Sequence, residues 1–298
     1  MTMSRAVRIR EFGGPEAMRI EQVELPDPGV GEVTVRQTAI GFNFIDVYQR
    51  RGAYPLPLPT GLGHEAAGVV EAVGPGVADL RAGDRVVYMN AGIGAYADRR
   101  NLPADRLATL PASVPDEDAA AIFFKAMTAQ YLLRKTHRVE PGDLLLVHAA
   151  AGGVGQILCR WAKALGAEVV GTAGSAAKCE IARAAGADHA IDYSKPGWPE
   201  AMLKATGGRK ARVVYDSVGK DTFLHSLDCA APFGLVVLYG AASGPAPAIE
   251  PELLNKEGCL FLTRPSVFPH NADPASFRAN AVEVFQAIAA GHVQAAIG

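Results

Sequence analysis

Residues 144–166 read LLLVHAAAGGVGQILCRWAKALG and decide the fold. The apolar run at 144–147 is typical of a strand that is buried on both faces. A glycine-rich turn follows it, and residues 156–165 have the apolar spacing of a helix that ends at Gly166. The order of strand, glycine turn and helix predicts the opening of a dinucleotide-binding unit.

The same alternation continues on the C-terminal side of this stretch. A second helix is predicted at 178–185, where it ends at Gly186. Further short strands are predicted at 168–172, 188–192, 212–216 and 235–239. Strands that alternate with helices indicate a parallel sheet with right-handed crossovers. We therefore expect a Rossmann domain, a doubly wound parallel sheet, at residues 128–265.

The first third of the chain has a different pattern. Alternating, β-branched segments at 33–38, 68–74 and 85–89 are separated by Gly, Pro and Asp. Such short strands suggest a sandwich or a barrel. After Pro115 the composition shifts, and acidic residues open an Ala-rich helix. We expect a β-rich domain on both sides of the Rossmann domain, at 1–127 and 266–298.

The glycine turn predicts a ligand as well as a fold. Gly152 and Gly153 let the backbone approach a pyrophosphate, which the N-terminus of the helix also attracts. Gly155 allows close packing of the helix. Ala150 stands where the usual G-x-G-x-x-G motif has its first glycine. The alternative is a tight turn with no ligand, and the context favours nucleotide binding.

The end of the second strand predicts which nucleotide binds. A cofactor with a free ribose 2′-hydroxyl calls for an Asp or Glu there, and Ala173 stands in that place. Ser175 and Lys178 could bind a 2′-phosphate, which a carboxylate would repel. We therefore expect NADPH rather than NADH. The alternative for Lys178 is a solvated lysine in the first turn of a helix.

Composition excludes several classes of protein. The 298 residues include 29 Lys and Arg against 31 Asp and Glu, a net charge of −2 that argues against nucleic acid as the main partner. The start has no signal-peptide pattern, and no apolar run is long enough to span a membrane. The four cysteines form no C-x-x-C pair, so a cytoplasmic location is expected.

Three further stretches carry a resemblance to a known family. Residues 43–55, NFIDVYQRRGAYP, resemble the N-x-x-D-x-Y-x-R-x-G-x-Y-P run of the quinone oxidoreductases, the zeta-crystallin-like branch of the medium-chain dehydrogenase/reductase superfamily. Residues 215–223 and 262–266 are similar to the same branch. The resemblance implies a GroES-like β-barrel domain packed on a Rossmann domain, with NADPH in the cleft between them. It also implies a homodimer that transfers a hydride, or electrons, to a quinone or a related electrophilic alkene.

The resemblance also implies roles for particular residues. The pyrophosphate would lie against Gly152, Gly153, Val154 and Gly155. The 2′-phosphate would lie among Gly174, Ser175, Lys178 and Tyr193. The nicotinamide end would be flanked by Asn43, Asp46, Thr128 and the backbone around Tyr239 and Gly240. The substrate pocket would be lined by Tyr48, Tyr54 and Arg264.

Three of these residues are the candidate catalytic groups. A hydroxyl of Tyr48 or Tyr54, or the guanidinium of Arg264, could stabilise the negative charge that builds on the quinone oxygen. Each tyrosine could equally be a packed side chain with its hydroxyl satisfied. Arg264 could equally form a surface ion pair.

Two features depart from the superfamily's patterns. Residues 63–68 resemble the G-H-E-x-x-G box of zinc alcohol dehydrogenases, but no cysteine precedes residue 159, so we expect no metal site. His64 is then a pocket-lining or hydrogen-bonded residue, and Glu65 a structural carboxylate. The chain also stops at residue 298, where the family continues with a last strand, so we expect a truncated C-terminus.

Two rival functions remain open. An enoyl-thioester reductase would use Tyr54 as its proton donor, since a carbon–carbon double bond needs both a hydride and a proton. Arg50, Arg51, Arg99 and Arg100 could then serve a thioester substrate, although such pairs are usually solvated. A non-catalytic NADPH-binding or structural protein would keep the same cofactor residues.

Overall fold

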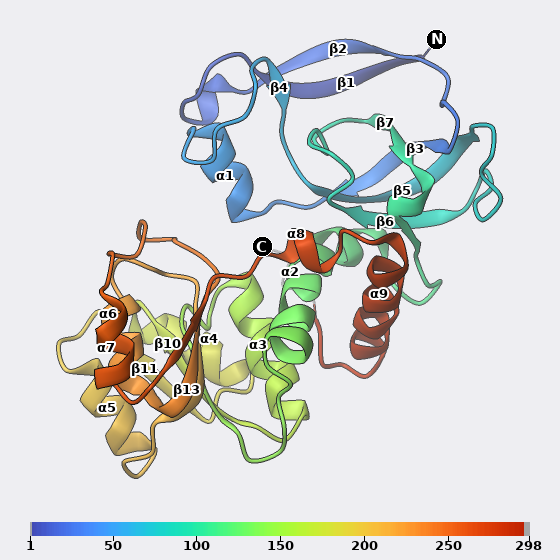
Figure 1. Cartoon of the computed structure of the whole chain (residues 1–298). Coiled ribbons are helices and arrows are strands. Elements are labelled where there is room, and N and C mark those ends of the chain that lie inside the picture. Colours follow the sequence, from blue (N-terminus) through green and yellow to red (C-terminus); the bar gives the residue numbers. More distant parts are fainter. Residues whose placement is uncertain (1, 295–298) are drawn as a thin grey trace. The chain divides into compact units, whose positions relative to one another are not determined.

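The computed structural model describes residues 2–294, which divide into two compact units (Figure 1). Among the described residues, the first unit comprises residues 2–124, 270–285 and 294, and the second comprises residues 125–269 and 286–293. Each unit is described by itself. The domain limits expected from the sequence stay a prediction, and residues 295–298 of the expected second segment lie outside the described residues.

The first unit is built on two antiparallel sheets. The larger sheet has the order β7-β3-β5-β6-β8, with bounds β3 (Glu32–Ile40), β5 (Glu65–Val73), β6 (Arg85–Met89), β7 (Arg99–Pro103) and β8 (Leu107–Thr109). The smaller sheet has the order β2-β1-β4, with bounds β1 (Thr2–Ile9), β2 (Arg19–Leu25) and β4 (Thr60–Gly61). Residues of the larger sheet such as Val33, Val86 and Leu102 are fully buried and form a hydrophobic core of the first unit.

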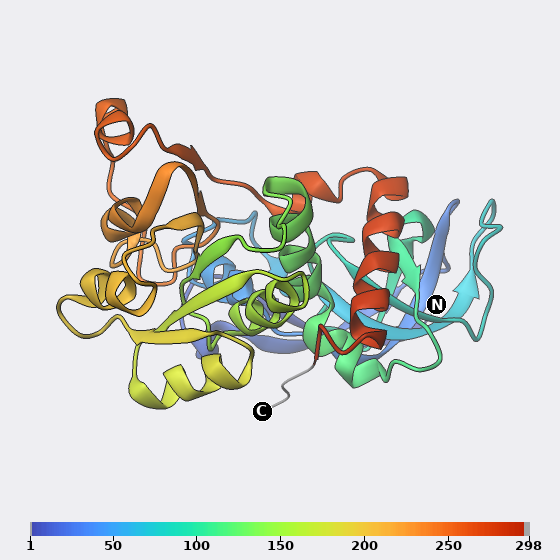
Figure 2. The ribbon, with the colours of Figure 1, turned by 90° about the horizontal axis from the view of Figure 1, so that it is seen from below.

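Helices complete this unit. Short turns of 3₁₀-helix lie at Pro15–Ala17 and Ala104–Arg106, and α1 spans Phe44–Arg50. The helices α2 (Asp116–Tyr131) and α9 (Pro274–Ala289) each contain a boundary between the units. Phe123 of α2 stacks on Phe285 of α9, with ring centroids 5.7 Å apart, and meets Phe277 edge-on at 6.1 Å. Figure 2 draws the backbone of both helices in a second view. These rings hold the C-terminal helix against the first unit.

The second unit contains a six-stranded sheet in which every pair of neighbouring strands is parallel. Its order is β11-β10-β9-β12-β13-β14, with bounds β9 (Leu144–Val147), β10 (Glu168–Ala173), β11 (His189–Asp192), β12 (Ala211–Asp216), β13 (Ala230–Leu238) and β14 (Phe261–Thr263). This is the strand order 3-2-1-4-5-6 of a doubly wound sheet, and the direction of winding reverses between β9 and β12. The predicted parallel sheet is confirmed.

Helices connect the strands of this sheet. They are α3 (Gly153–Ala164), α4 (Ala176–Ala184), α5 (Trp198–Ala205), α6 (Phe223–Cys229) and α7 (Pro251–Lys256). A π-helical turn at Leu132–Thr136 precedes β9, and α8 (Val267–His270) follows β14. The helix expected from residue 156 begins three residues earlier, at Gly153, because glycines give no side-chain periodicity. Among the described residues, no helix is both long and apolar enough to cross a membrane.

Candidate functional site

The glycine turn lies at the C-terminal end of β9, at the point where the winding reverses. Gly152 precedes α3 in extended conformation, and both Gly152 and Gly153 are exposed. Gly155 is buried, and a Cβ there would overlap the carbonyl oxygen of Ala149 and lie 2.7 Å from Cα of Ala150. The turn therefore has an open face for a ligand and a closed face that only glycine fits.

Lys125 of α2 adds a positive charge to this turn. A Cβ on Gly153 would lie 2.8 Å from Cδ of Lys125, so the lysine stem lies beside that glycine. The helix N-terminus and a nearby ammonium group both favour an anion. The sequence analysis did not select Lys125 as a binding residue, because it is distant from the motif in sequence and its spacing carries no signal.

The four residues expected at a 2′-phosphate lie near one another. Ser175 is the N-cap of α4, and its hydroxyl accepts a hydrogen bond from the backbone N–H of Lys178 at 3.3 Å. The hydroxyl of Tyr193 would lie 3.3 Å from a Cβ on Gly174. The preceding strand β10 ends at Ala173 without a carboxylate. A helix N-terminus with a lysine beside it suits a phosphate.

Another group of predicted residues surrounds the end of β13. The guanidinium of Arg264 donates to the carbonyl oxygens of Leu238 and Gly240, at 3.3 and 3.5 Å. Burial raises the pKa of the Tyr239 hydroxyl, and a hydrogen bond with Ser217 opposes that shift. Arg264 therefore lies against the backbone around Tyr239 and Gly240. Thr128, on α2, is buried.

In the first unit, Asn43 and Asp46 close the start of α1. The Asp46 carboxylate accepts from the backbone N–H of Asn43 at 2.9 Å, which forms a capping box, and from the hydroxyl of Tyr96 at 2.8 Å. The Asn43 amide donates to Glu65 at 2.8 Å, and Glu65 also accepts from the backbone N–H of Phe124. Both predicted cofactor residues are therefore buried members of a hydrogen-bonded group.

His64, which precedes Glu65 in the sequence, is also buried. It is 4% exposed, and its Nε2 is 3.0 Å from Oε1 of Gln49. Burial, with a smaller contribution from the charge of Arg100, lowers the pKa of His64 to about 4. The ring is therefore neutral at pH 7. Its hydrogen bond to Gln49 is one of the two roles that the sequence predicted for His64. Among residues 2–294 no cluster of three or more His, Cys, Asp or Glu side chains could hold a metal ion.

The two candidate tyrosines form an aromatic group at α1. Tyr48 lies within this helix, and Tyr54 follows it. The ring centroids of Tyr48 and Tyr54 are 5.0 Å apart, and Phe44 meets Tyr48 edge-on at the same distance. Tyr54 is 40% exposed, and Phe44 is 54% exposed. The group therefore offers phenol hydroxyls and an apolar surface that solvent reaches.

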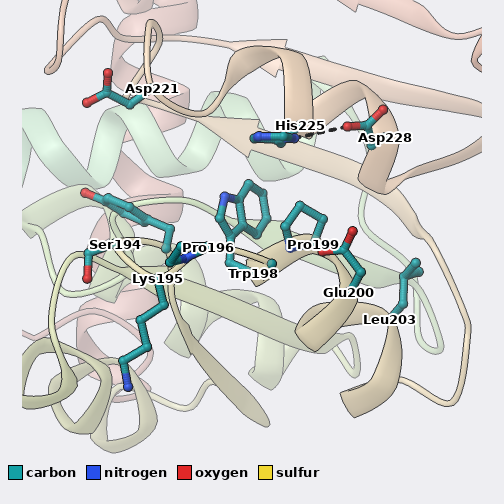
Figure 3. Close-up of a pocket in the computed structure, with 12 residues that line it drawn as sticks. Ser194, Lys195, Pro196, Trp198, Pro199, Glu200, Leu203, Asp221, His225 and Asp228 are labelled. Carbon is teal, nitrogen blue, oxygen red and sulfur yellow. Dashed lines mark hydrogen bonds and ion pairs between the residues drawn. The ribbon is translucent and has the colours of Figure 1, made fainter.

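A pocket with a cavity volume of about 510 Å³ opens on the second unit (Figure 3). It is lined by residues around α5 and α6, among them Trp198 and His225, and His225 pairs with Asp228 at 3.2 Å. Of the predicted site residues, only Tyr193 lines it. The glycine turn lies outside the pocket.

Comparison with known proteins gives the class first. Residues 29–112 match the family described as alcohol dehydrogenase GroES-like domain, and residues 153–279 match zinc-binding dehydrogenase. These matches and the two folds define a medium-chain dehydrogenase/reductase, which confirms the predicted fold class.

Individual relatives narrow the class to a family. Quinone oxidoreductase 1 of Escherichia coli is 46% identical over 98% of this chain and 90% of the relative. The 2-haloacrylate reductase of a Burkholderia species is 43% identical over 99% of this chain and 91% of the relative. The solved structure of E. coli quinone oxidoreductase with NADPH has a TM-score of 0.95 at 45% identity, and covers 99% of this chain and 90% of that one. The chain belongs to the quinone oxidoreductase family.

Proposed function

We propose that this protein is an NADPH-dependent quinone oxidoreductase that uses no zinc. The observation that carries the proposal is the open glycine turn at the point where the sheet reverses its winding, followed by a β10 strand that ends without a carboxylate. The E. coli quinone oxidoreductase, at 45% identity, was solved in complex with NADPH. A doubly wound sheet binds its ligand outside the carboxyl ends of its strands, at that reversal.

The residues present fit the cofactor. The turn from Gly152 to Gly155 would take the pyrophosphate on its exposed face, at Gly152 and Gly153, with Lys125 adding a positive charge. The 2′-phosphate would lie at Ser175 and Lys178, with Tyr193 beside Gly174. Asn43, Asp46, Thr128 and the backbone at Tyr239 and Gly240 remain our assignment for the nicotinamide end.

The cofactor supplies the hydride, and the chain must supply alignment and charge stabilisation. We assign that second task to the hydroxyls of Tyr48 and Tyr54 and to the guanidinium of Arg264. The exposed aromatic group around Tyr54 offers both an apolar surface for a quinone ring and hydroxyl donors for its oxygens.

Reduction of an electron-poor alkene is the second candidate activity. It is favoured by the 43% identity to a 2-haloacrylate reductase and by the exposure of Tyr54. A carbon–carbon double bond needs a proton after the hydride, and the Tyr54 hydroxyl is the side chain that we assign to donate it.

The proposal includes a homodimer. Strand β14 pairs only with β13 among the described strands, and it carries Phe261, which is 62% exposed. An exposed apolar edge strand favours pairing with a second chain. A Phe261→Lys variant that remains dimeric in light scattering would count against this edge. We also propose a cytoplasmic location, which is supported by the four free thiols.

The activity is tested by steady-state oxidation of NADPH and of NADH. The acceptors are 1,4-benzoquinone, 2-chloroacrylate and crotonyl-coenzyme A, each with and without a chelator. We expect chelator-insensitive turnover of the quinone with NADPH. Turnover of an alkene alone would move the function to the second candidate. Tight NADPH binding without turnover of any acceptor would indicate a binding protein.

Lys178 tests the choice of cofactor. Lys178→Ala removes the charge assigned to the 2′-phosphate, so we expect about tenfold weaker binding of NADPH, the scale of one charge-assisted hydrogen bond, and unchanged binding of NADH. The matched control is Arg183→Ala, which removes a positive charge from the last turn of the same helix. Equal effects of the two variants on NADPH would contradict the assignment.

A further inference from the structure

A chain of buried polar side chains lies behind the glycine turn. His148, the first residue after β9, is fully buried, as are Thr172 and Ser226. Nδ1 of His148 is 2.7 Å from the hydroxyl of Thr172, and Nε2 is 3.0 Å from the hydroxyl of Ser226. The Ser226 hydroxyl in turn donates to Asp216 at 2.8 Å. Three strand ends and α6 are thus linked by side chains alone.

The carboxylate of Asp216 determines which groups donate and which accept in this series of hydrogen bonds. Asp216 also accepts from the backbone N–H groups of Val218 and Gly219 and from the hydroxyl of Thr222, so it acts as an acceptor throughout. Ser226 has a second acceptor, the carbonyl of Thr222 at 3.1 Å, but the charged and closer partner is Asp216.

The tautomer of His148 follows from that direction. With its proton given to Asp216, the Ser226 oxygen accepts from Nε2–H of His148. Nδ1 then carries no proton and accepts from the Thr172 hydroxyl. Burial lowers the pKa of His148, against the opposing charge of Asp216, so the ring stays neutral. Every polar atom of the buried ring has a partner, and a single tautomer satisfies all of them.

These hydrogen-bonded side chains attach a turn whose backbone is strained. Ala149 follows His148 at φ +50°, a left-handed conformation that alanine rarely adopts and that persists only when its surroundings enforce it. The backbone N–H of His148 donates to Tyr215 at 3.0 Å, and that of Ala150 donates to Thr172 at 2.9 Å. The side chain of His148 adds a third attachment at the same point.

We propose that His148, held by Thr172, Ser226 and Asp216, is a positioning residue for the cofactor turn at Gly152–Gly155. The inference rests on the proposed binding of NADPH by that turn. His148 touches no ligand in this scheme; it fixes the entry of the turn so that the N–H groups of the first turn of α3 stay aimed at the pyrophosphate. Asp216 also fixes the loop after β12, because it accepts from the backbone N–H groups of Val218 and Gly219.

The test uses substitutions that separate hydrogen bonding from packing. Thr172→Val keeps the side-chain volume and removes the hydroxyl, whereas Thr172→Ser keeps the hydroxyl and removes a methyl group. Ser226→Ala cuts the link to Asp216 with little change of volume. The matched control is His225→Ala, the exposed neighbour of Ser226 on α6, which pairs with Asp228 and lines the pocket of Figure 3.

We expect Ser226→Ala and Thr172→Val each to weaken NADPH binding about tenfold in direct fluorescence titration, the scale of one lost buried hydrogen bond. KM for NADPH should rise with them, and kcat at saturation should stay within about twofold, since the reacting end of the cofactor is untouched. Thr172→Ser and His225→Ala should bind NADPH like the wild type. Thermal melting identifies any variant that fails to fold.

A second readout needs no cofactor. ¹⁵N spectra of the wild type at pH 7 should show His148 as the neutral Nε2–H tautomer. The amide signals of Gly152, Gly153 and Gly155 should move in Ser226→Ala but not in His225→Ala. The inference is overturned if Thr172→Ser weakens binding as much as Thr172→Val, or if the glycine signals stay in place. A wild type that fails to bind NADPH refutes the proposed function instead, and the glycine signals still decide whether the chain positions the turn.

Discussion

Replacing Gly155 by alanine tests the closed face of the cofactor turn. The new Cβ would overlap the carbonyl oxygen of Ala149 and lie 2.7 Å from Cα of Ala150, and both are backbone atoms of a turn already at positive φ. Overpacking of a buried site costs about 1–3 kcal/mol. For a unit of this size that free energy corresponds to a fall in Tm of roughly 2–12 °C. The backbone must shift to make room, so NADPH binding should weaken together with stability.

Gly152→Ala is the matched control. Gly152 has φ −77°, which alanine adopts readily, and a Cβ there would lie 3.1 Å from the Ala149 carbonyl oxygen on the exposed face. This variant should keep its Tm within about 2 °C, since it makes no buried clash, while it blocks the approach of the pyrophosphate. Thermal melting and titration with NADPH measure the two effects. The reasoning is refuted if Gly155→Ala melts like the wild type, or if Gly152→Ala is the less stable of the two.

Two further predictions concern the first unit. Asp46→Ala leaves the Tyr96 hydroxyl and the backbone N–H of Asn43 without their acceptor, so urea denaturation should show a free energy of unfolding lower by about 2–4 kcal/mol. The control is Asp79→Ala, which removes an exposed carboxylate. Equal stability of the two variants would contradict the role of Asp46 as an acceptor. Burial lowers the pKa of His64 from its usual 6.5 to about 4 in the fold, so the unfolded chain binds more protons between these two values. The free energy of unfolding must therefore fall as the pH falls from about 6.5 to 4. His64→Gln should flatten that dependence of Tm on pH, and parallel curves for the two proteins would exclude His64 as its source.

The strands and helices of the second unit could be predicted because each is marked by a pattern within its own short stretch of sequence. Parallel strands buried on both faces appear as apolar runs, and glycines mark the ends of their helices. The strand predicted at 144–147 coincides with β9. The attachment of His148 to Ser226 spans 78 positions in the sequence. A single histidine in a turn gives no periodic pattern. The hydrogen bonds that join His148 to Thr172 and Ser226 could therefore not be predicted.

The first unit shows how one pattern can have two explanations. The run that begins at Asn43 carries the resemblance to the quinone oxidoreductases, and its N-x-x-D start is also the sequence pattern of a capping box. The structure displays the second explanation directly, since Asp46 accepts from the backbone of Asn43 at 2.9 Å. The roles of these two residues at the nicotinamide remain a prediction that helix capping neither supports nor opposes.

The G-H-E box at residues 63–68 has an explanation in this chain that involves no metal. Glu65 is fully buried, and its two carboxylate oxygens accept from the Asn43 amide and from the backbone of Phe124. Removing the carboxylate would leave both donors buried and unsatisfied, which costs about 1–3 kcal/mol for each. His64 is in turn 3.0 Å from Gln49 and stays neutral. Hydrogen bonding within the first unit is therefore sufficient reason for the box to hold these two residues at these positions.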